Sequence, residues 1–360
     1  MVFDAPDFDN HETILFGSDP ETGLRAIIAV HDTALGPACG GCRMWPYASE
    51  AEAVRDVLRL SRGMSYKNAM AGLPLGGGKA VVIGDSRKDK TEAMMRAFGR
   101  VVEQLGGRYI TAEDVGTSVA DMQAMGQSTR HVAGLAKGSA ASGDPSPFTA
   151  YGVFLGLKAA VRHRLGTDSL KGLRVAVQGL GNVGGNLARQ LAEAGATLVV
   201  SDIHADAVAR AVAAYGATTL PPERIHAAEV DVFAPCALGA VLHERSVAEL
   251  KASVVAGAAN NQLATDPVGE LLRQRGILYA PDYVINAGGI INVAAEVMHA
   301  YDRDAVLRQV ERIPATLAEV FRRADADGRP TSEVADRMAR ERLAAARGGK
   351  AAGPLARVAE

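Results

Sequence analysis

Two lysines twelve residues apart, Lys67 and Lys79, are the residues of this sequence best suited to acid–base chemistry. Lys79 ends the run Gly76-Gly77-Gly78-Lys79, and a substrate can press against a backbone without side chains while water is excluded. Lost hydration and a neighbouring ammonium both disfavour the charged form of Lys79, so we predict a general base near neutral pH. Lys67 can stay charged and hold a carboxylate. The alternative, a glycine-rich turn followed by a surface lysine, stays open on this segment alone.

This glycine run does not match a phosphate-binding loop. That motif, G-x-x-x-x-G-K-[ST], requires glycine at its first position and Ser or Thr after the lysine. With Lys79 as the lysine, these positions hold Leu73 and Ala80. A nucleoside triphosphatase is therefore not predicted.

A second glycine motif follows an apolar run in the second half of the chain. Residues 174–178 (RVAVQ) read as a buried strand, and residues 186–194 have helical spacing. Between them lie the residues of a dinucleotide-binding fingerprint, G-x-G-x-x-G: Gly179, Leu180, Gly181, Asn182, Val183 and Gly184. In this context the first glycine makes the turn, the second admits a pyrophosphate and the third lets helix and strand pack. The alternative is a tight turn in an unrelated parallel sheet.

An acidic residue completes the fingerprint. The next predicted strand, residues 197–201, ends at Asp202. A carboxylate at this place accepts hydrogen bonds from the ribose hydroxyls and repels a 2′-phosphate, which favours NAD over NADP.

Composition limits the remaining functions. A length of 360 residues suits two domains, and 48% hydrophobic residues can fill two cores. The formal net charge is −2 without a long basic block, which argues against binding to nucleic acid or to an anionic membrane. We find neither a signal peptide at the acidic N-terminus nor an apolar run that could span a bilayer, so we expect a cytoplasmic protein.

The elements that must position these motifs follow two periodicities. Strands are predicted at residues 25–30, 80–84, 108–112, 230–233, 253–256 and 276–279. Helices are predicted at 91–103, 149–163, 304–325 and 331–347, and another begins with a capping box formed by Ser49 and Glu52. Residues 134–147 are poor in bulky side chains and are predicted to connect the domains as a hinge, and residues 348–360 to form a frayed tail.

Six motifs in the same order resemble the Glu/Leu/Phe/Val amino-acid dehydrogenases, and within that family the leucine-using branch is the most similar. They lie at residues 35–45 (LGPACGGCRMW), 63–69 (GMSYKNA), 76–79 (GGGK), 111–116 (TAEDVG), 179–184 (GLGNVG) and 280–289 (APDYVINAGG). The resemblance implies an α/β fold of two domains separated by a cleft. It places a substrate-binding and oligomerisation domain at residues 1–140, joined by a C-terminal helix at 331–360, and a Rossmann NAD-binding domain at 141–330.

The resemblance also implies a reaction and the roles of individual residues. The family converts an L-amino acid reversibly into a 2-oxo acid and ammonia with NAD(P). Lys79 resembles the lysine that activates the attacking water, Lys67 the lysine that grips the substrate carboxylate, and Asp114 the aspartate that exchanges a proton with the substrate nitrogen. Asn261, chosen over its neighbour Asn260, matches an asparagine of the substrate site. Thr149 and Asn286 are assigned to the cofactor. A helix cap is the alternative role for Asp114.

Four further positions concern the substrate side chain. Cys39, just before Gly40, stands where glutamate-using relatives carry a lysine, and Val293 stands where they carry a serine. A buried distal carboxylate would then be unpaired at a cost of several kcal/mol, so glutamate is not expected. Ala112, Ile290 and Val293 favour leucine, valine and isoleucine. Cys39 replaces the usual leucine and frees volume, so the ranking of aliphatic substrates stays open.

The cysteines and histidines give no competing chemistry. Cys39 and Cys42 form a C-x-x-C pair, but only Cys236 remains elsewhere, so neither a structural zinc site nor a redox role is favoured. No histidine pair has metal-ligand spacing, and we expect no metal.

Three functions are compatible with these observations. The first is an NAD-dependent branched-chain amino-acid dehydrogenase acting in catabolism, assembled as a homo-oligomer. The second is a phenylalanine-type or broader amino-acid dehydrogenase. The third is an NAD-binding regulatory protein without turnover, which the presence of Lys67, Lys79 and Asp114 disfavours.

Overall fold

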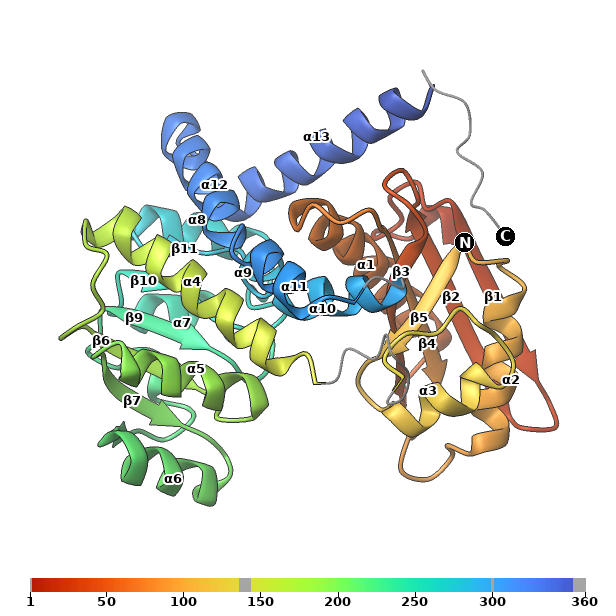
Figure 1. The fold of residues 1–360 in the computed structure, drawn as a ribbon, viewed down its shortest axis with the longest axis horizontal. Helices are drawn as coiled ribbons and strands as arrows, with labels where there is room; N and C mark the ends of the chain where they lie inside the picture. Colours follow the sequence, from red (N-terminus) through yellow and green to blue (C-terminus); the bar gives the residue numbers. More distant parts are fainter. Residues whose placement is uncertain (1, 136–143, 299–300, 352–360) are drawn as a thin grey trace. The chain divides into compact units, whose positions relative to one another are not determined.

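The computed structural model describes residues 2–135, 144–298 and 301–351 (Figure 1). The chain divides into two compact units, each with its own sheet. Unit 1 consists of residues 1–143, 293–302 and 339–360, and unit 2 consists of residues 144–292 and 303–338. The chain thus crosses between units inside two helices, whereas the sequence placed all of residues 331–360 with the first domain. Residues 348–351, expected in a frayed tail, belong to the last helix of the chain, and residues 352–360 lie outside the described residues.

Unit 1 contains a mixed sheet in the order β1-β2-β4-β3-β5. Its strands are β1 (Thr13–Asp19), β2 (Leu24–Asp32), β3 (Ala38–Trp45), β4 (Gly76–Ile83) and β5 (Tyr109–Glu113). β2 runs antiparallel to both β1 and β4, whereas β4, β3 and β5 are parallel. The carboxyl ends of these three parallel strands therefore meet at one edge of the sheet.

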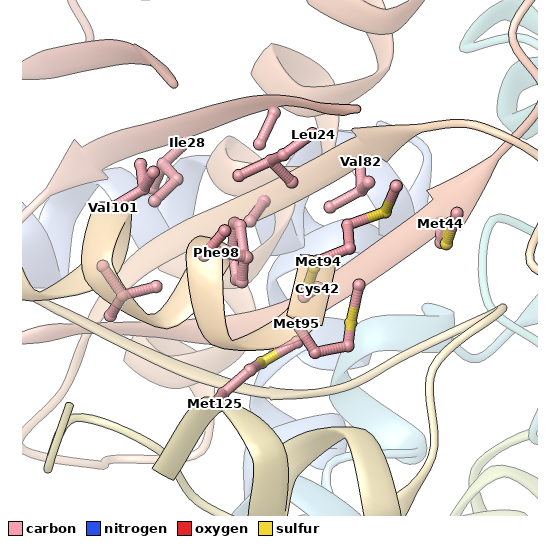
Figure 2. Packing of buried hydrophobic residues seen from close by; sticks show 14 of the residues in the cluster. Leu24, Ile28, Cys42, Met44, Val82, Met94, Met95, Phe98, Val101 and Met125 are labelled. Carbon is pink, nitrogen blue, oxygen red and sulfur yellow. The ribbon is translucent and has the colours of Figure 1, made fainter. Parts of the chain in front are cut away.

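Helices cover both faces of this sheet. On one face, α1 (Glu50–Met70) packs Val57 and Leu58 against Ile27 and Val81. On the other face lie α2 (Glu92–Glu103) and α3 (Val119–Gly126). Figure 2 shows the core on this second side, where side chains of α2 meet those of the strands, among them Leu24, Ile28, Cys42, Met44, Val82, Met94, Met95, Phe98 and Val101. Since Cys42 and Met44 face α2, Arg43 between them faces the α1 side.

The helix starts in unit 1 follow capping rules, with one correction. Thr91 caps α2 by accepting a bond from Met94 N–H, and Ser49 caps α1 by accepting one from Glu52 N–H. A capping box also requires the Glu52 side chain to accept the N–H of Ser49. The Glu52 carboxylate instead accepts the N–H of Ala48 at 2.8 Å.

Unit 2 contains a six-stranded parallel sheet in the order β11-β10-β9-β6-β7-β8. The strands are β6 (Arg174–Gln178), β7 (Thr197–Ser201), β8 (Thr218–Thr219), β9 (Val232–Pro235), β10 (Val254–Val255) and β11 (Leu278–Tyr279). Counted within the unit, this is the strand order of a Rossmann fold. The order reverses between β6 and β9, where ligands bind in such sheets.

Six helices of unit 2 alternate with or follow its strands in the sequence, and α4 packs on α5. Their bounds are α4 (Ser146–Leu165), α5 (Asn182–Glu193), α6 (Ala205–Tyr215), α7 (Glu244–Glu249), α8 (Pro267–Gln274) and α9 (Asp282–Ile285). α7 and α8 bury Val247, Val268 and Leu272 in one core with Phe233 and Val255 of the sheet. Two single 3₁₀ turns complete the fold, at Val2–Asp4 in unit 1 and Ile225–Ala227 in unit 2.

The C-terminal helices correct one prediction. The single helix expected at residues 304–325 is two helices, α11 (Arg303–Val310) and α12 (Ile313–Asp327). Pro314 explains the break, because in a continuous helix its ring would clash with the carbonyl of Val310. In the first turn of α12 it is tolerated. α10 (Gly288–Val297) precedes them, and α13 (Thr331–Ala351) follows.

The end of α13 is anchored to unit 1 by three arginines. Arg340 donates to the hydroxyl of Tyr66 at 3.0 Å, Arg342 donates to the carbonyls of Ala69 and Met70, and Arg347 pairs with Asp32. Among the described residues, no helix is long and apolar enough to cross a membrane.

Candidate active site

The glycine run before Lys79 is part of a strand, not a turn. Residues 76–78 open β4, and added Cβ atoms there would meet protein rather than open space. At Gly76 a Cβ would lie 2.1 Å from the Asp32 carbonyl oxygen, and at Gly78 it would lie 2.6 Å from the Tyr109 ring. The run is therefore strand rather than a glycine-rich turn, and the substrate crevice along this backbone stays a prediction. The glycines serve close packing.

The packing that the glycines allow positions Lys67. At Gly77 a Cβ would lie 2.1 Å from both the backbone nitrogen and the hydroxyl of Ser65 on α1. Asn68 on the same helix donates to the Gly76 carbonyl at 2.6 Å. These two contacts fix the end of α1 against β4, and Lys67 lies between Ser65 and Asn68 in the sequence. The run thus holds the helix that carries Lys67 against the strand that carries Lys79.

Lys79 is paired with a carboxylate. Its Nζ lies 2.8 Å from Oδ2 of Asp114, which follows the end of β5. The Nε of Arg43 donates to the same Oδ2 at 3.0 Å. The Lys79 side chain is only 8% exposed, and those of Asp114 and Arg43 are each 22% exposed. The structure thus brings Lys79 and Asp114 together, with an arginine that sequence reasoning did not assign to the site.

Gly41 makes this pairing sterically possible. A Cβ at Gly41 would lie 2.4 Å from the carbonyl oxygen of Glu113 and 2.8 Å from the Cβ of Asp114. The backbone of Asp114 is held by Thr117, whose hydroxyl contacts the Asp114 N–H at 3.0 Å and the Cys42 carbonyl at 2.9 Å. The turn after β5 therefore lies directly against β3 and directs the carboxylate toward Lys79. Asp114 is not the N-cap of α3, because Ser118 has that position.

The charges around Asp114 hold it ionised. Burial alone would raise the pKa of its carboxyl group, but Lys79 and Arg43 outweigh burial and lower the pKa to about 2. Desolvation would lower the pKa of Arg43, and the carboxylates of Asp114 and Asp56 raise it above its ordinary value. Both partners are therefore charged throughout the neutral range.

The predicted substrate residues of unit 1 lie beside this pair. Gly40 is in register with Thr111, and Ala112 is in register with Gly41. The carbonyl of Gly40 accepts a bond from the hydroxyl of Tyr109 at 2.6 Å. Ala112 is half-buried, whereas the Cys39 side chain is completely buried, so a role for Cys39 in choosing the substrate stays a prediction.

Cys39 and Cys42 are buried in a setting that disfavours their thiolate forms. Burial raises the pKa of the Cys39 thiol to about 12 and raises that of Cys42 further above its usual range. Thiolates are the reactive form, so neither cysteine is suited to redox chemistry near neutral pH. Within the residues that the structure describes, no three His, Cys, Asp or Glu side chains form a metal-binding group.

In unit 2, each fingerprint glycine has a different environment. Gly179 has φ +92°, a left-handed conformation that makes the turn after β6. A Cβ at Gly184 would lie 1.9 Å from the Gly179 carbonyl oxygen, so α5 packs closely on the loop. A Cβ at Gly181 would meet nothing within 4 Å. The loop is therefore open at Gly181, Leu180 precedes that opening, and the first residues of α5, Asn182 and Val183, follow it.

Asp202 braces this loop from the end of β7. Its Oδ2 accepts the N–H of Leu180 at 2.6 Å, and its Oδ1 accepts the N–H of His204 at 2.8 Å. A carboxylate oxygen can accept more than one hydrogen bond, so these contacts leave acceptor capacity for ribose hydroxyls.

The predicted asparagines differ in their contacts. Asn286 is buried, and its Nδ2 donates to the Ala258 carbonyl at 3.0 Å and to Oδ1 of Asn260 at 2.8 Å. Its Oδ1 is buried without a donor among the described residues. Asn261 is exposed with φ +52°, and its carbonyl accepts from Ala240. The structure thus joins Asn286 to Asn260, the member of the doublet that was not chosen.

Two glycines after Asn286 bring the start of α10 against α4. A Cβ at Gly288 would lie 2.1 Å from the Phe148 carbonyl oxygen, and one at Gly289 would lie 2.7 Å from the hydroxyl of Thr149. Thr149, assigned to the cofactor, therefore lies beside the N-A-G-G motif. Ile290 and Val293 follow on α10 three residues apart, and both are half-buried.

Sequence reasoning missed three residues of these arrangements. Arg43 and Gly41 were quoted inside a motif without roles, and Asn260 was set aside. The alternation of apolar residues around Arg43 was an available signal, because a lone arginine in a buried strand needs an acidic partner. No local pattern separates Asn260 from Asn261.

The chain was compared with known families and proteins. Residues 11–131 match the family model described as Glu/Leu/Phe/Val dehydrogenase, dimerisation domain, and residues 142–208 and 202–350 match Glutamate/Leucine/Phenylalanine/Valine dehydrogenase. Leucine dehydrogenase of Geobacillus stearothermophilus is 55% identical over 334 residues, which cover 93% of this chain and 91% of the relative. Valine dehydrogenase of Streptomyces virginiae is 48% identical, covering 95% and 96%.

A solved structure shares the fold over nearly the whole chain. The crystal structure of L-tryptophan dehydrogenase from Nostoc punctiforme matches with a TM-score of 0.84 at 45% identity. The match covers 94% of this chain and 97% of that chain. Relatives named for leucine, valine and tryptophan thus match more than nine-tenths of this chain.

Proposed function

This chain belongs to the Glu/Leu/Phe/Val dehydrogenase family, and on that premise we propose that it catalyses the reversible NAD-dependent oxidative deamination of a branched-chain L-amino acid. The products are the 2-oxo acid, ammonia released as ammonium, NADH and a proton, and one water is consumed. The observation that carries the proposal is the buried contact of Lys79 with Asp114, held where β5 ends beside β3 and β4.

The residues of unit 1 divide the acid–base work. Lys79 is the base that takes a proton from the water attacking the substrate carbon, and Asp114 exchanges a proton with the substrate nitrogen. Their contact of 2.8 Å allows a proton to pass between the two groups. Lys67, held beside β4 by the contacts of Ser65 and Asn68, binds the substrate carboxylate as a point charge.

The residues of unit 2 fit NAD. Bound NAD supplies the acceptor for the hydride that leaves the substrate Cα. The open space at Gly181 and the N-terminus of α5 suit a pyrophosphate, and Asp202 suits the ribose hydroxyls. The buried, unsatisfied Oδ1 of Asn286 suits an amide donor, with Thr149 nearby on α4. We assign Asn260 to this group with Asn286, and retain Asn261 as a substrate residue.

Apolar residues define the preferred substrate. Cys39, Ala112, Ile290 and Val293 carry no charge, so the side-chain end of the site lacks a partner for a distal carboxylate. A branched aliphatic side chain needs no such partner. One methylene is worth about 1–3 kcal/mol of discrimination, roughly 10–200-fold in kcat/KM, so the ranking of leucine, valine and isoleucine stays open.

A parallel rate measurement tests this function. NADH formation at 340 nm would be followed with leucine, valine, isoleucine, phenylalanine, tryptophan and glutamate. We expect kcat/KM for leucine or valine to exceed that for each aromatic residue and for glutamate at least tenfold, about 1.4 kcal/mol. Preferred glutamate would refute the pocket assignment. NADH binding without turnover of any amino acid would make the protein an NAD-binding regulator instead.

An aromatic substrate is the second candidate. The L-tryptophan dehydrogenase is 45% identical with a TM-score of 0.84, and Cys39 is smaller than the leucine of the leucine-using branch. Phenylalanine or tryptophan equal to leucine in the same panel would move the assignment to that branch.

We also propose a symmetric homo-oligomer in the cytoplasm. The match of residues 11–131 to a dimerisation domain supports self-association, and the three cysteines are free thiols. The proposed assembly surface belongs to the substrate domain at residues 1–140, together with the C-terminal helix from residue 331. Light scattering after size-exclusion chromatography would give the number of subunits, and a monomer would contradict the proposal.

A further inference from the structure

Arg43 joins the Lys79–Asp114 pair to a second acidic residue. Its Nε donates to Oδ2 of Asp114 at 3.0 Å, and its Nη1 donates to Oδ2 of Asp56 at 2.9 Å. Asp56 lies on α1, and it also accepts bonds from the hydroxyl of Tyr47 at 2.7 Å and from Nη2 of Arg59 at 3.3 Å. The guanidinium of Arg43 is therefore fixed on two sides.

We propose that Arg43 is a positioning residue for the deamination reaction: it holds the Asp114 carboxylate ionised and directed at Lys79, and Asp56 fixes Arg43 in turn. The inference rests on the proposed function of Lys79 and Asp114. It gives β3, through Arg43, and α1, through Asp56, a role in keeping Asp114 ionised.

The geometry requires an arginine rather than any cation. The planar guanidinium presents separate N–H groups to two carboxylates, which a lysine ammonium on a flexible stem does not reproduce. The side chains of Arg43 and Asp114 are 22% exposed and that of Asp56 is 15% exposed, so water screens these contacts less than it screens a surface pair. A buried carboxylate that loses one of two cations becomes harder to ionise.

The other titratable groups around Asp114 do not replace Arg43. Cys42, Tyr47 and Tyr109 all feel the Asp114 charge, and burial raises the pKa of each of them. They stay neutral in acidic and neutral solution. Nearby Asp121 on α3 is paired with Lys90 at 2.7 Å, and Glu113 carries a like charge. Lys79 and Arg43 are thus the cations in contact with the Asp114 carboxylate.

The test compares Arg43→Gln with Arg59→Gln in the full-length enzyme. Arg59 contacts the same Asp56 but makes no contact with Asp114, so it is the matched control. For Arg43→Gln we expect kcat with leucine to fall at least tenfold and the acid limb of the kcat–pH profile to move up by about one pH unit. Without the Arg43 cation, the protonated form of the Asp114 carboxyl group is favoured, so its pKa should rise. KM for leucine and the Kd of NADH should change less than threefold, because Lys67 and unit 2 are unaltered.

Two further variants separate positioning from folding. Arg43→Lys keeps the charge without the double contact. Compared with Arg43→Gln, it should restore part of kcat and reverse most of the pH shift. Tyr47→Phe removes only the hydroxyl bond to Asp56 and should give a smaller loss than Arg43→Gln. Circular dichroism and thermal melts would be recorded for every variant.

The outcomes distinguish a failure of the role of Arg43 from a failure of the proposed function. An Arg43→Gln enzyme with the kcat and pH profile of Arg59→Gln overturns the role of Arg43 while leaving the proposed function intact. An Arg43→Gln enzyme that loses activity only in proportion to lost folded protein, with an unshifted profile, has a structural arginine and also overturns it. A wild-type enzyme without turnover of any amino acid overturns the proposed function, and this inference with it.

Discussion

The two units each contain a glycine-rich motif beside a candidate site, and the two motifs do opposite work. In unit 1, a Cβ at Gly77 would lie 2.1 Å from the backbone nitrogen of Ser65, so this glycine allows α1 to approach β4, and a Cβ at Gly76 would lie 2.1 Å from the Asp32 carbonyl oxygen. In unit 2, a Cβ at Gly181 would meet nothing within 4 Å, so that glycine leaves space at the N-terminus of α5. One run brings protein against protein, and the other keeps room for a ligand.

The difference shows what glycine means in each context. Glycine spacing with a strand before it and a helix after it predicts a loop, because the chain must turn there. A run of glycines followed by an apolar stretch does not predict a loop, because a strand can begin within the run when neighbouring segments pack closely against its backbone. Gly76, Gly77 and Gly78 are strand residues for this reason.

The largest effect is expected for Gly77→Ala. The new methyl group would overlap the backbone nitrogen of Ser65, which a rotamer change cannot relieve, so we expect a loss of about 3 kcal/mol or more in the free energy of unfolding. Activity should fall because α1 carries Lys67. Urea unfolding measures the stability, and a variant as stable as the wild type would remove the packing role of the run.

Gly181→Ala is the matched substitution in unit 2. Gly181 has φ −65°, which alanine adopts without strain, so the unfolding free energy should stay within about 0.5 kcal/mol of the wild type. The Kd of NADH should rise at least tenfold, because the methyl group occupies the open space. Unchanged NADH affinity would contradict the assignment of that space to the cofactor.

The next prediction concerns the pH dependence of folding stability, to which two buried histidines of unit 1 should contribute. Desolvation lowers the pKa of His11 to about 4, against 6.5 in the unfolded chain, and burial also lowers the pKa of His31. The neutral rings are therefore favoured in the folded state, and the stability they give is present above pH 6.5 and is lost as the pH falls toward 4. We expect His11 to account for about 2 kcal/mol of this loss.

The hydrogen bonds of His11 explain why its protonation should destabilise the fold, and they define a variant that tests this. Its Nδ1 accepts the N–H of Asp9 at 3.2 Å, and its Nε2 lies 3.0 Å from the Leu58 carbonyl oxygen. Protonation of Nδ1 would break the first contact. Urea unfolding at pH 7 and pH 4.5 should show a smaller difference for His11→Gln than for the wild type. An equal difference in the two proteins would exclude His11 as the source.

The smallest effect is expected for Asp202→Ala. Loss of the carboxylate removes the repulsion of a 2′-phosphate, so the ratio of kcat/KM with NAD to that with NADP should fall about tenfold, roughly 1.4 kcal/mol. The preference among amino acids should not change. Because Asp202 also accepts the N–H of Leu180, the NADH affinity should weaken moderately. Equal use of both cofactors by the wild-type enzyme would contradict the role of Asp202.

The sequence predicted unit 2 more fully than unit 1. The fingerprint, both flanking strands and Asp202 lie within one stretch of chain, so local patterns defined the arrangement. The pair of Lys79 and Asp114 is distant in sequence, and its contact with Arg43 depends on the order β4-β3-β5, which no local pattern gives. Family resemblance named Lys79 and Asp114 but gave no role to Arg43.

Other differences have equally physical causes. The break between α11 and α12 follows from Pro314, whose effect was predictable but was not applied. The choice between Asn260 and Asn261 required the three-dimensional structure, in which Asn260 accepts a hydrogen bond from Asn286 and Asn261 has a left-handed backbone with φ +52°. The expected hinge at residues 134–147 lies partly outside the described residues.

The central claim is that unit 1 supplies the acid–base chemistry and unit 2 binds NAD. Lys79→Ala tests it most directly when kcat with leucine and the Kd of NADH are measured on the same preparation, with Lys67→Ala as the comparison. For Lys79→Ala we predict a kcat at least about a hundredfold below the wild type and an NADH Kd within twofold, while Lys67→Ala chiefly raises KM for leucine. A Lys79→Ala enzyme with near-normal kcat would contradict the account.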